Sequence, residues 1–93
     1  MSSAPVHHIL FYDYVENMLE RRRPYREAHV ARIRAQREAG RITLAGALGD
    51  PPHGAAIVFA GVSSGEIEAF AAEDPYVTAG LVTTQRIERW NVV

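Results

Sequence analysis

The sequence contains no cysteine, which excludes disulfide bonds, thiolate nucleophiles and metal sites built on cysteine. It has almost no net charge, with a formal value of −1 at pH 7, so there is no overall positive field to attract nucleic acid. The uninterrupted apolar stretch at residues 55–60 is far too short to cross a bilayer, and residues 1–5 lack the basic start and apolar run of a signal peptide. We therefore expect a cytoplasmic protein without nucleic-acid or membrane partners.

In other respects the composition is typical of a small globular protein. Hydrophobic residues make up 47% and charged residues 23% of the 93 positions, values typical of an ordinary folded domain. The length leaves room for one domain spanning residues 1–93, with a core from about residue 6 to the end. A chain this short buries only a limited share of its surface when it folds. We therefore expect a partner to cover further apolar surface.

Periodicity and turn signals predict six main elements. Strands are expected at residues 6–15, 42–48, 55–62 and 82–92, and helices at 24–39 and 63–72. Pro24 suits a first helical turn and Gly40 a helix end, while Ser63 followed by Glu66 fits a capping box. Asp74 is expected to cap a further short turn that begins at Pro75.

The predicted order is βαββαβ, which indicates an α+β fold with a ferredoxin-like antiparallel sheet and both helices on one face. The opposite sheet face then has no cover. An exposed apolar face of that size favours packing of two copies against each other, so we expect a homodimer, built as a dimeric α+β barrel.

Several local patterns coincide with this fold. They are the run at residues 23–29 (RPYREAH), the run at 45–48 (AGAL), the run at 73–81 (EDPYVTAGL) and the run at 87–90 (IERW). Together they resemble the YCII (YciI-like) family over nearly the whole chain from His7 onward. The combination of Arg26 and His29 on a helix with a later Asp-Pro-Tyr-x-x-Ala-Gly-Leu is much more specific than either part alone.

The resemblance implies the dimeric ferredoxin-like fold and a His–Asp active-site pair, which correspond here to His29 and Asp74. It does not imply one reaction, since at least one branch of the family eliminates chloride from a chlorinated hydroxylated aromatic. The sequence also departs from the commonest family pattern, because Gly46-Ala47 stands where Gly-Pro is usual.

His29 and Asp74 each have a catalytic and a structural interpretation. Histidine exchanges protons near neutral pH, and a carboxylate on its second ring nitrogen fixes the tautomer, so His29 and Asp74 can act together as general acid and base. His29 is equally compatible with a hydrogen-bonded histidine in the core or in a dimer interface. An aspartate directly before a proline is what a helix N-terminus needs for backbone reasons alone.

Three further residues are candidates for substrate binding. Arg26 lies three positions before His29 and can pair with a substrate carboxylate or phenolate, although nearby acidic side chains are alternative partners. Tyr76 and Trp90 can stack on an aromatic substrate, yet both are also typical packing residues, and Trp90 suits a dimer seam.

We therefore predict a cofactor-free small-molecule enzyme, lyase- or isomerase-like, that uses His29 and Asp74 for acid–base chemistry on an acidic or aromatic ligand. No metal ligands are predicted, because His7 and His8 point to opposite strand faces. The alternative is a noncatalytic module with the same fold that binds small ligands or only dimerises.

Overall fold

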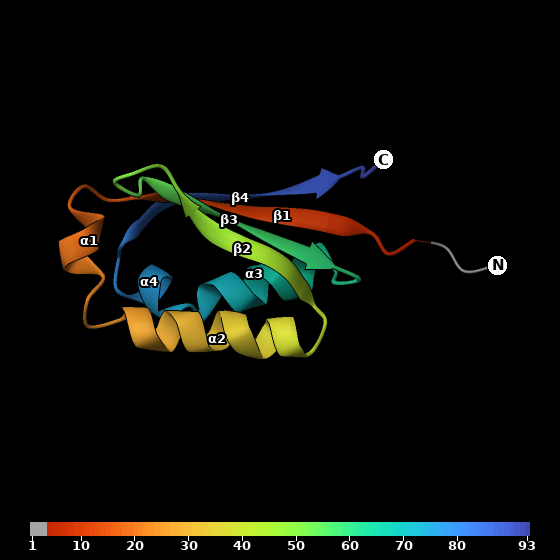
Figure 1. The fold of residues 1–93 in the computed structure, drawn as a ribbon, viewed down its shortest axis with the longest axis horizontal. Coiled ribbons are helices and arrows are strands. Elements are labelled where there is room, and N and C mark those ends of the chain that lie inside the picture. The colour runs from red at the N-terminus through yellow and green to blue at the C-terminus, as the bar shows by residue number, and fades with distance from the viewer. Residues whose placement is uncertain (1–3) are drawn as a thin grey trace.

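The fold places an antiparallel sheet over a layer of helices (Figure 1). The computed structural model describes residues 4–93. Its elements are β1 (His7–Tyr14), α1 (Met18–Arg21), α2 (Arg26–Glu38), β2 (Ile42–Leu48), β3 (Gly54–Ala60), α3 (Ser64–Ala72), α4 (Pro75–Thr78) and β4 (Val82–Trp90). The strands are ordered β2-β3-β1-β4, and every neighbouring pair is antiparallel. The ferredoxin-like order predicted from the sequence is confirmed.

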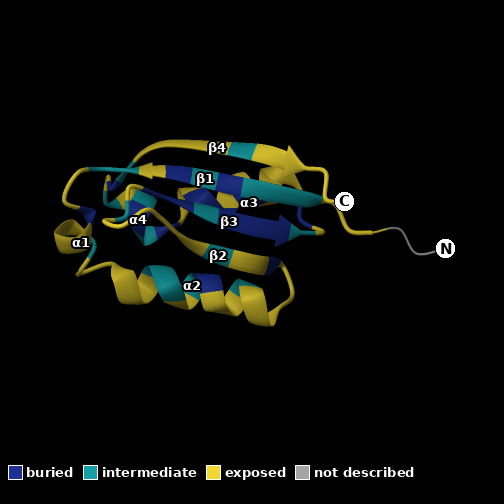
Figure 2. Cartoon of the chain, turned by 45° about the horizontal axis from the view of Figure 1, so that its top comes forward, coloured by how far each residue is buried: buried dark blue, intermediate teal, exposed yellow. Residues whose placement is uncertain are grey.

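The core lies between the sheet and the helices. Along β1 the side chains alternate, so Leu10 and Tyr12 turn toward the helices and are almost completely buried. Ile33 of α2 and Ile67 of α3 reach the same cluster from the helix layer. Figure 2 shows the buried positions concentrated in the two central strands, whereas the edge strands β2 and β4 are largely exposed. Each large apolar side chain buried in this way contributes about 1.5–3 kcal/mol.

The first helical region differs from the sequence prediction. The helix predicted at residues 24–39 corresponds to α2, which begins at Arg26, and the short helix α1 precedes it where no helix is predicted. Asn17 adopts a left-handed conformation with φ of 59° and starts α1, whose last turn leads directly into further turns around Pro24. The amide of Tyr25 donates to the carbonyl of Arg22, which makes a tight turn before α2. This turn brings Arg22 close to the start of α2.

The remaining boundaries follow local chemistry. The capping box is present, because Ser63 accepts a hydrogen bond from the amide of Glu66 and the Glu66 carboxylate accepts one in return. Strand β3 ends at Ala60 rather than at residue 62, since Gly61 follows with φ of 69°, a left-handed conformation that ends the extended run. Strand β4 ends at Trp90 rather than at residue 92.

Among residues 4–93, no helix lies on the second face of the sheet. Val58 is paired with Ile9 on one side and with Leu44 on the other, so these three side chains share this face. Phe11 lies beside them beneath the guanidinium of Arg86, which is 4.2 Å from the centre of the ring. Leu44 is 66% exposed. The single chain therefore presents an apolar strip on the face opposite the helices.

Candidate active site

His29 and Asp74 meet below the sheet although they are far apart in sequence. His29 projects from the first turns of α2, and Asp74 lies between α3 and α4. The Nδ1 atom of His29 is 2.8 Å from Oδ1 and 3.0 Å from Oδ2 of Asp74. The His29 side chain is 11% exposed and that of Asp74 is 1% exposed. The carboxylate is thus covered, while the imidazole retains access to solvent.

Asp74 has a full set of hydrogen-bond donors around it. The Tyr12 hydroxyl donates to Oδ2 at 2.9 Å, and the backbone amide of Tyr76 donates to Oδ1 at 3.0 Å. The second of these bonds is the N-terminal cap of α4, which the sequence predicted from the Asp-Pro step. A buried carboxylate is tolerated only when such partners compensate for lost hydration. Capping and contact with His29 are therefore combined in one side chain.

The arrangement defines which ring nitrogen is available for chemistry. An ionised carboxylate only accepts hydrogen bonds, so the Nδ1 atom of His29 carries the hydrogen that it donates to Asp74. In the neutral ring, Nε2 is then the basic nitrogen. The imidazole is also stacked on the ring of Tyr76, with centroids 3.8 Å apart and planes inclined by 7°. One contact on its edge and one on its face hold the ring in a single orientation.

Three tyrosines surround this pair. Burial raises the pKa of Tyr12, and the charge of Asp74 and the hydrogen bond to it raise the pKa further. Burial also raises the pKa of Tyr14 and of Tyr76. All three side chains are therefore neutral at physiological pH, and the Tyr12 hydroxyl can act as a permanent donor to Asp74.

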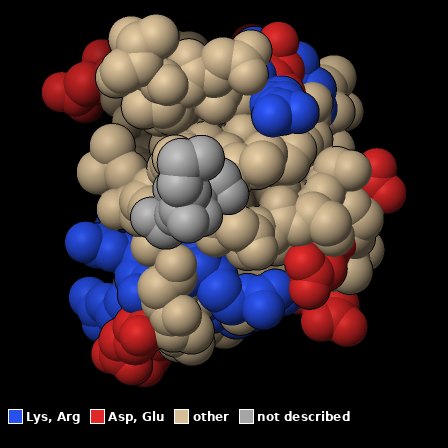
Figure 3. All heavy atoms as spheres, turned by 90° about the vertical axis from the view of Figure 1, so that its right-hand side faces the viewer, with Lys and Arg blue, Asp and Glu red and all other residues tan. Residues whose placement is uncertain are grey.

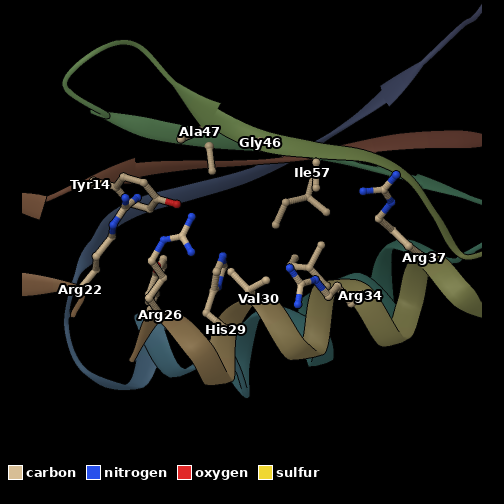
Figure 4. A pocket seen from close by; sticks show the side chains of 14 residues that line it. Tyr14, Arg22, Arg26, His29, Val30, Arg34, Arg37, Gly46, Ala47 and Ile57 are labelled. Atoms are coloured by element: carbon tan, nitrogen blue, oxygen red, sulfur yellow. The ribbon is translucent and has the colours of Figure 1, made fainter. Parts of the chain in front are cut away.

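A cavity of about 270 Å³ opens beside His29, between α2 and the strands β2 and β3. Figure 4 shows the imidazole rising from α2 toward the sheet, with Arg26 and Arg22 on the side of Tyr14 and with Arg37 farther along the helix. Small-ligand sites in proteins are typically about 300–1,000 Å³. The size suits a small organic molecule. The lining residues are Tyr14, Arg22, Arg26, His29, Val30, Ile33, Arg34, Arg37, Ala45, Gly46, Ala47, Ala55, Ile57 and Tyr76.

Four of the five site residues expected from the sequence are together here. His29, Arg26 and Tyr76 line the cavity, and Asp74 lies behind His29. Trp90 lies elsewhere: it is at the end of β4, opposite His7 in the sheet, and is 46% exposed. Within one chain Trp90 does not line the cavity.

Sequence reasoning missed several residues of the site. Tyr12 is one of them, because its bond to Asp74 spans 62 positions and follows from the folding of β1 over α4. Arg22, Arg34 and Arg37 also line the cavity. A signal for Arg37 existed in its helical spacing from Arg26, because eleven positions correspond closely to three helical turns.

The part of the chain that the structure describes contains neither a metal-binding cluster nor a membrane-spanning helix. Residues 4–93 contain no group of three or more His, Cys, Asp or Glu side chains placed to hold a metal ion. None of the helices in the same range is long and apolar enough to cross a membrane.

Comparisons with known proteins agree on the type of domain. The YCII-related domain family matches residues 6–91. Among solved structures, 5-chloro-2-hydroxyhydroquinone dehydrochlorinase from Burkholderia phenoliruptrix, in complex with 2,5-dihydroxybenzoquinone, is similar with a TM-score of 0.79. The identity is 21%, and the likeness covers 94% of this chain and 95% of that one, which shows a shared fold. No curated protein matches the sequence.

Proposed function

Because the chain belongs to the YCII-related family, we propose that it is a small-molecule enzyme in which His29 and Asp74 perform general acid–base catalysis. The observation that carries the proposal is the 2.8 Å contact between Nδ1 of His29 and the buried Asp74 carboxylate, at the wall of a cavity. This contact leaves Nε2 of His29 as the proton acceptor and stabilises the imidazolium that forms when the proton arrives. Elimination and isomerisation are reactions that such an acid–base pair can perform.

In both reactions the first step is the same. Nε2 of His29 removes a proton from the substrate, and the electron pair of the broken bond forms a new π bond. In an elimination, a leaving group departs with its own bonding pair, and the imidazolium later gives its proton to water. In an isomerisation, the imidazolium returns the proton to another atom of the substrate. Asp74 keeps its charge throughout and orients the ring.

Negative charge develops on the substrate as the proton leaves. Arg26 projects from the turn of α2 next to His29 and can pair with a carboxylate or phenolate oxygen. Tyr76, stacked on His29, supplies an apolar wall on which a planar substrate can rest. The structurally similar dehydrochlorinase acts on a chlorinated hydroxylated aromatic, as its name states, and this supports an acidic or aromatic substrate here.

The second part of the proposal concerns assembly. The chain forms a homodimer through the sheet face that carries no helix, with Leu44, Val58, Ile9 and Phe11 in the contact. Burying this strip removes a contiguous apolar surface from water, which is the dominant favourable term in such associations. Trp90, at the margin of the same face, is covered by the partner in this arrangement.

Proton exchange tests the catalytic proposal directly. The protein is incubated in deuterated water with small keto acids, lactones and hydroxylated aromatics, and NMR follows loss of substrate hydrogen and formation of product. We expect His29→Gln to lower the rate by about 10²–10⁴-fold while a folded protein is retained. His53→Gln is the matched control, because His53 lies in the turn between β2 and β3 and not at this cavity.

The outcomes separate two classes of function. Equal rates for the parent and His29→Gln would contradict the catalytic proposal. Ligands that raise the melting temperature of the parent but are never converted would instead support the noncatalytic binding module.

A further inference from the structure

The cavity beside His29 has an unusual balance of charge. Four arginines line it, and no aspartate or glutamate does. These arginines are Arg22, Arg26, Arg34 and Arg37. All ten basic residues of the chain are arginine, whose planar guanidinium binds carboxylate and phosphate groups through two parallel hydrogen bonds. The cavity therefore has the charge of an anion-binding site with more than one cation available.

The four arginines of the cavity differ in their ion pairing from other arginines of the chain. Within residues 4–93, none of the four forms an ion pair with an acidic side chain. Elsewhere the pairs Arg23–Glu20, Arg32–Glu73, Arg41–Glu66 and Arg86–Glu88 are formed. Figure 3, which views the molecule from the end at which α2 terminates, shows basic side chains gathered in the helix layer with acidic ones at the margins. Like charges held close together repel, so a bound anion would relieve this repulsion.

The four arginines form two groups. Arg22 and Arg26 lie at the end of the cavity near Tyr14 and His29 (Figure 4). Their charges act on Tyr76, because both favour its ionised form and oppose the rise in its pKa caused by burial. Arg34 and Arg37 lie farther along α2, eight and eleven positions after Arg26, which corresponds to about 12 and 16 Å of helix axis. A single small anion cannot contact both groups fully.

The surface between the two groups is apolar. Val30 and Ile33 contribute to it from α2, and Ala45 and Ile57 from the sheet. A ligand that bridges the two arginine groups passes over these side chains, which offer no hydrogen bonds to it. The best fit for the middle of such a ligand is a hydrocarbon segment or an aromatic ring.

We propose that the substrate of this site is an elongated dianion, with one carboxylate or phosphate held by Arg22 and Arg26, an apolar middle, and a second anionic group held by Arg34 and Arg37. The inference rests on the proposed function in one respect: the reacting atom lies next to the first anionic group, within reach of His29. The second group takes no part in proton transfer. Arg34 and Arg37 therefore determine specificity for ligand length and charge, and they are not catalytic residues.

Isothermal titration calorimetry on the full chain tests this inference. Adipate is compared with hexanoate, which has the same carbon chain and one anionic group fewer. Succinate and suberate vary the length, and 4-phosphonobutanoate distinguishes phosphate-type from carboxylate recognition. We expect the best dianion to bind at least about tenfold more tightly than its monoanionic counterpart, the effect of one charge-assisted hydrogen bond.

Variants then assign the two ends. Arg34→Gln and Arg37→Gln should remove most of the preference for the dianion and leave binding of hexanoate unchanged. Arg23→Gln is the matched control, since Arg23 is paired with Glu20 and does not line the cavity, and it should retain the full preference. His29→Gln should also retain it, because the anions are held by arginines.

Two results would overturn the inference. They are equal affinity for dianions and monoanions across the length series, and an unchanged preference in both Arg34→Gln and Arg37→Gln. The inference and the proposed function fail separately. Proton exchange by a parent protein that shows no dianion preference would refute the inference alone, whereas tight dianion binding with no turnover of any compound would refute catalysis alone.

Discussion

The rings of His29 and Tyr76 lie parallel and in contact, with centroids 3.8 Å apart and planes inclined by 7°. Asp74 connects the same two residues a second time, because its Oδ1 atom accepts from the Tyr76 amide and lies 2.8 Å from Nδ1 of His29. The imidazole is therefore positioned by one short segment, residues 74–76, through both its edge and its face. The same three residues therefore orient the ring of His29 and cap α4.

Substitutions at Tyr76 should distinguish the effect of its ring, which stacks on His29, from the effect of its hydroxyl group. Tyr76→Phe keeps the aromatic face against His29 and should change proton exchange little. Tyr76→Leu removes that face and leaves a space in the small cluster formed with Met18 and Leu81, so we expect loss of about 2–4 kcal/mol of unfolding free energy together with slower exchange. Chemical denaturation and the exchange assay measure the two effects. Equal behaviour of the two variants would show that the stack does not orient the ring.

The tautomer of His29 should depend on Asp74. In the parent, the neutral ring should carry its hydrogen on Nδ1, because the carboxylate can only accept. In Asp74→Asn the amide can present either an oxygen or an NH₂ group, so we expect a mixture of tautomers. Nitrogen chemical shifts of the imidazole ring distinguish them by NMR. A parent ring protonated mainly on Nε2 would contradict the assignment of Nε2 as the base.

Tyr12→Phe should weaken the fold at neutral pH. The change removes one of the donors to a buried carboxylate, and we expect a loss of about 1–3 kcal/mol. Tyr14→Phe is the matched control, since Asp74 accepts no hydrogen bond from Tyr14 in the described residues and a smaller loss is expected there. Chemical denaturation at pH 7 measures both. Equal losses would mean that the bond between Tyr12 and Asp74 adds nothing to stability.

The raised pKa values of Tyr12 and Tyr14 also predict a pH dependence. Below about pH 10 these tyrosines are neutral in both the folded and the unfolded chain, and their full contribution to stability is present. Above that pH the unfolded chain releases protons that the folded chain retains, so stability falls as pH rises toward the folded pKa values. We expect the fall to be shallower in Tyr12→Phe. Denaturation midpoints measured through the alkaline range, with tyrosinate absorbance, would record it.

The proposed dimer predicts a strong effect of charge on the uncovered sheet face. Leu44→Asp places a carboxylate beside Val58 and should convert the dimer to a monomer, because an unpaired charge would have to be buried in the interface. Leu19→Asp is the control, since Leu19 is also an exposed leucine but lies on α1. Light scattering gives the mass of each variant. A parent that is monomeric at micromolar concentration would contradict the proposed assembly.

Local signals in the sequence were sufficient for most of the element order. The capping box of Ser63 and Glu66 and the step from Asp74 to Pro75 depend on contacts within a few positions, so their residue types alone identify them. Alternation along a strand likewise puts Leu10 and Tyr12 on one face, and in the structure both are buried. Boundaries were less exact where left-handed residues such as Asn17 and Gly61 intervene.

The site could be predicted only in part. The resemblance of local motifs identifies His29 and Asp74, and the position three residues before His29 makes Arg26 a candidate for substrate binding. No such spacing connects Tyr12 with Asp74, because 62 positions separate them and a strand has to fold over a helical turn to bring them together. Trp90 was expected near the substrate by residue type, and the structure places it on the other face of the sheet.

The sequence by itself determined the order of strands and helices, the caps and the inward faces, because these depend on interactions between residues close along the chain. The tertiary structure alone decided that Tyr12 would complete the environment of Asp74 and that Arg22 would join Arg26, Arg34 and Arg37 around one cavity. The physical reason is that burial and convergence of charge depend on how separate elements pack, and no local pattern specifies the distance between them.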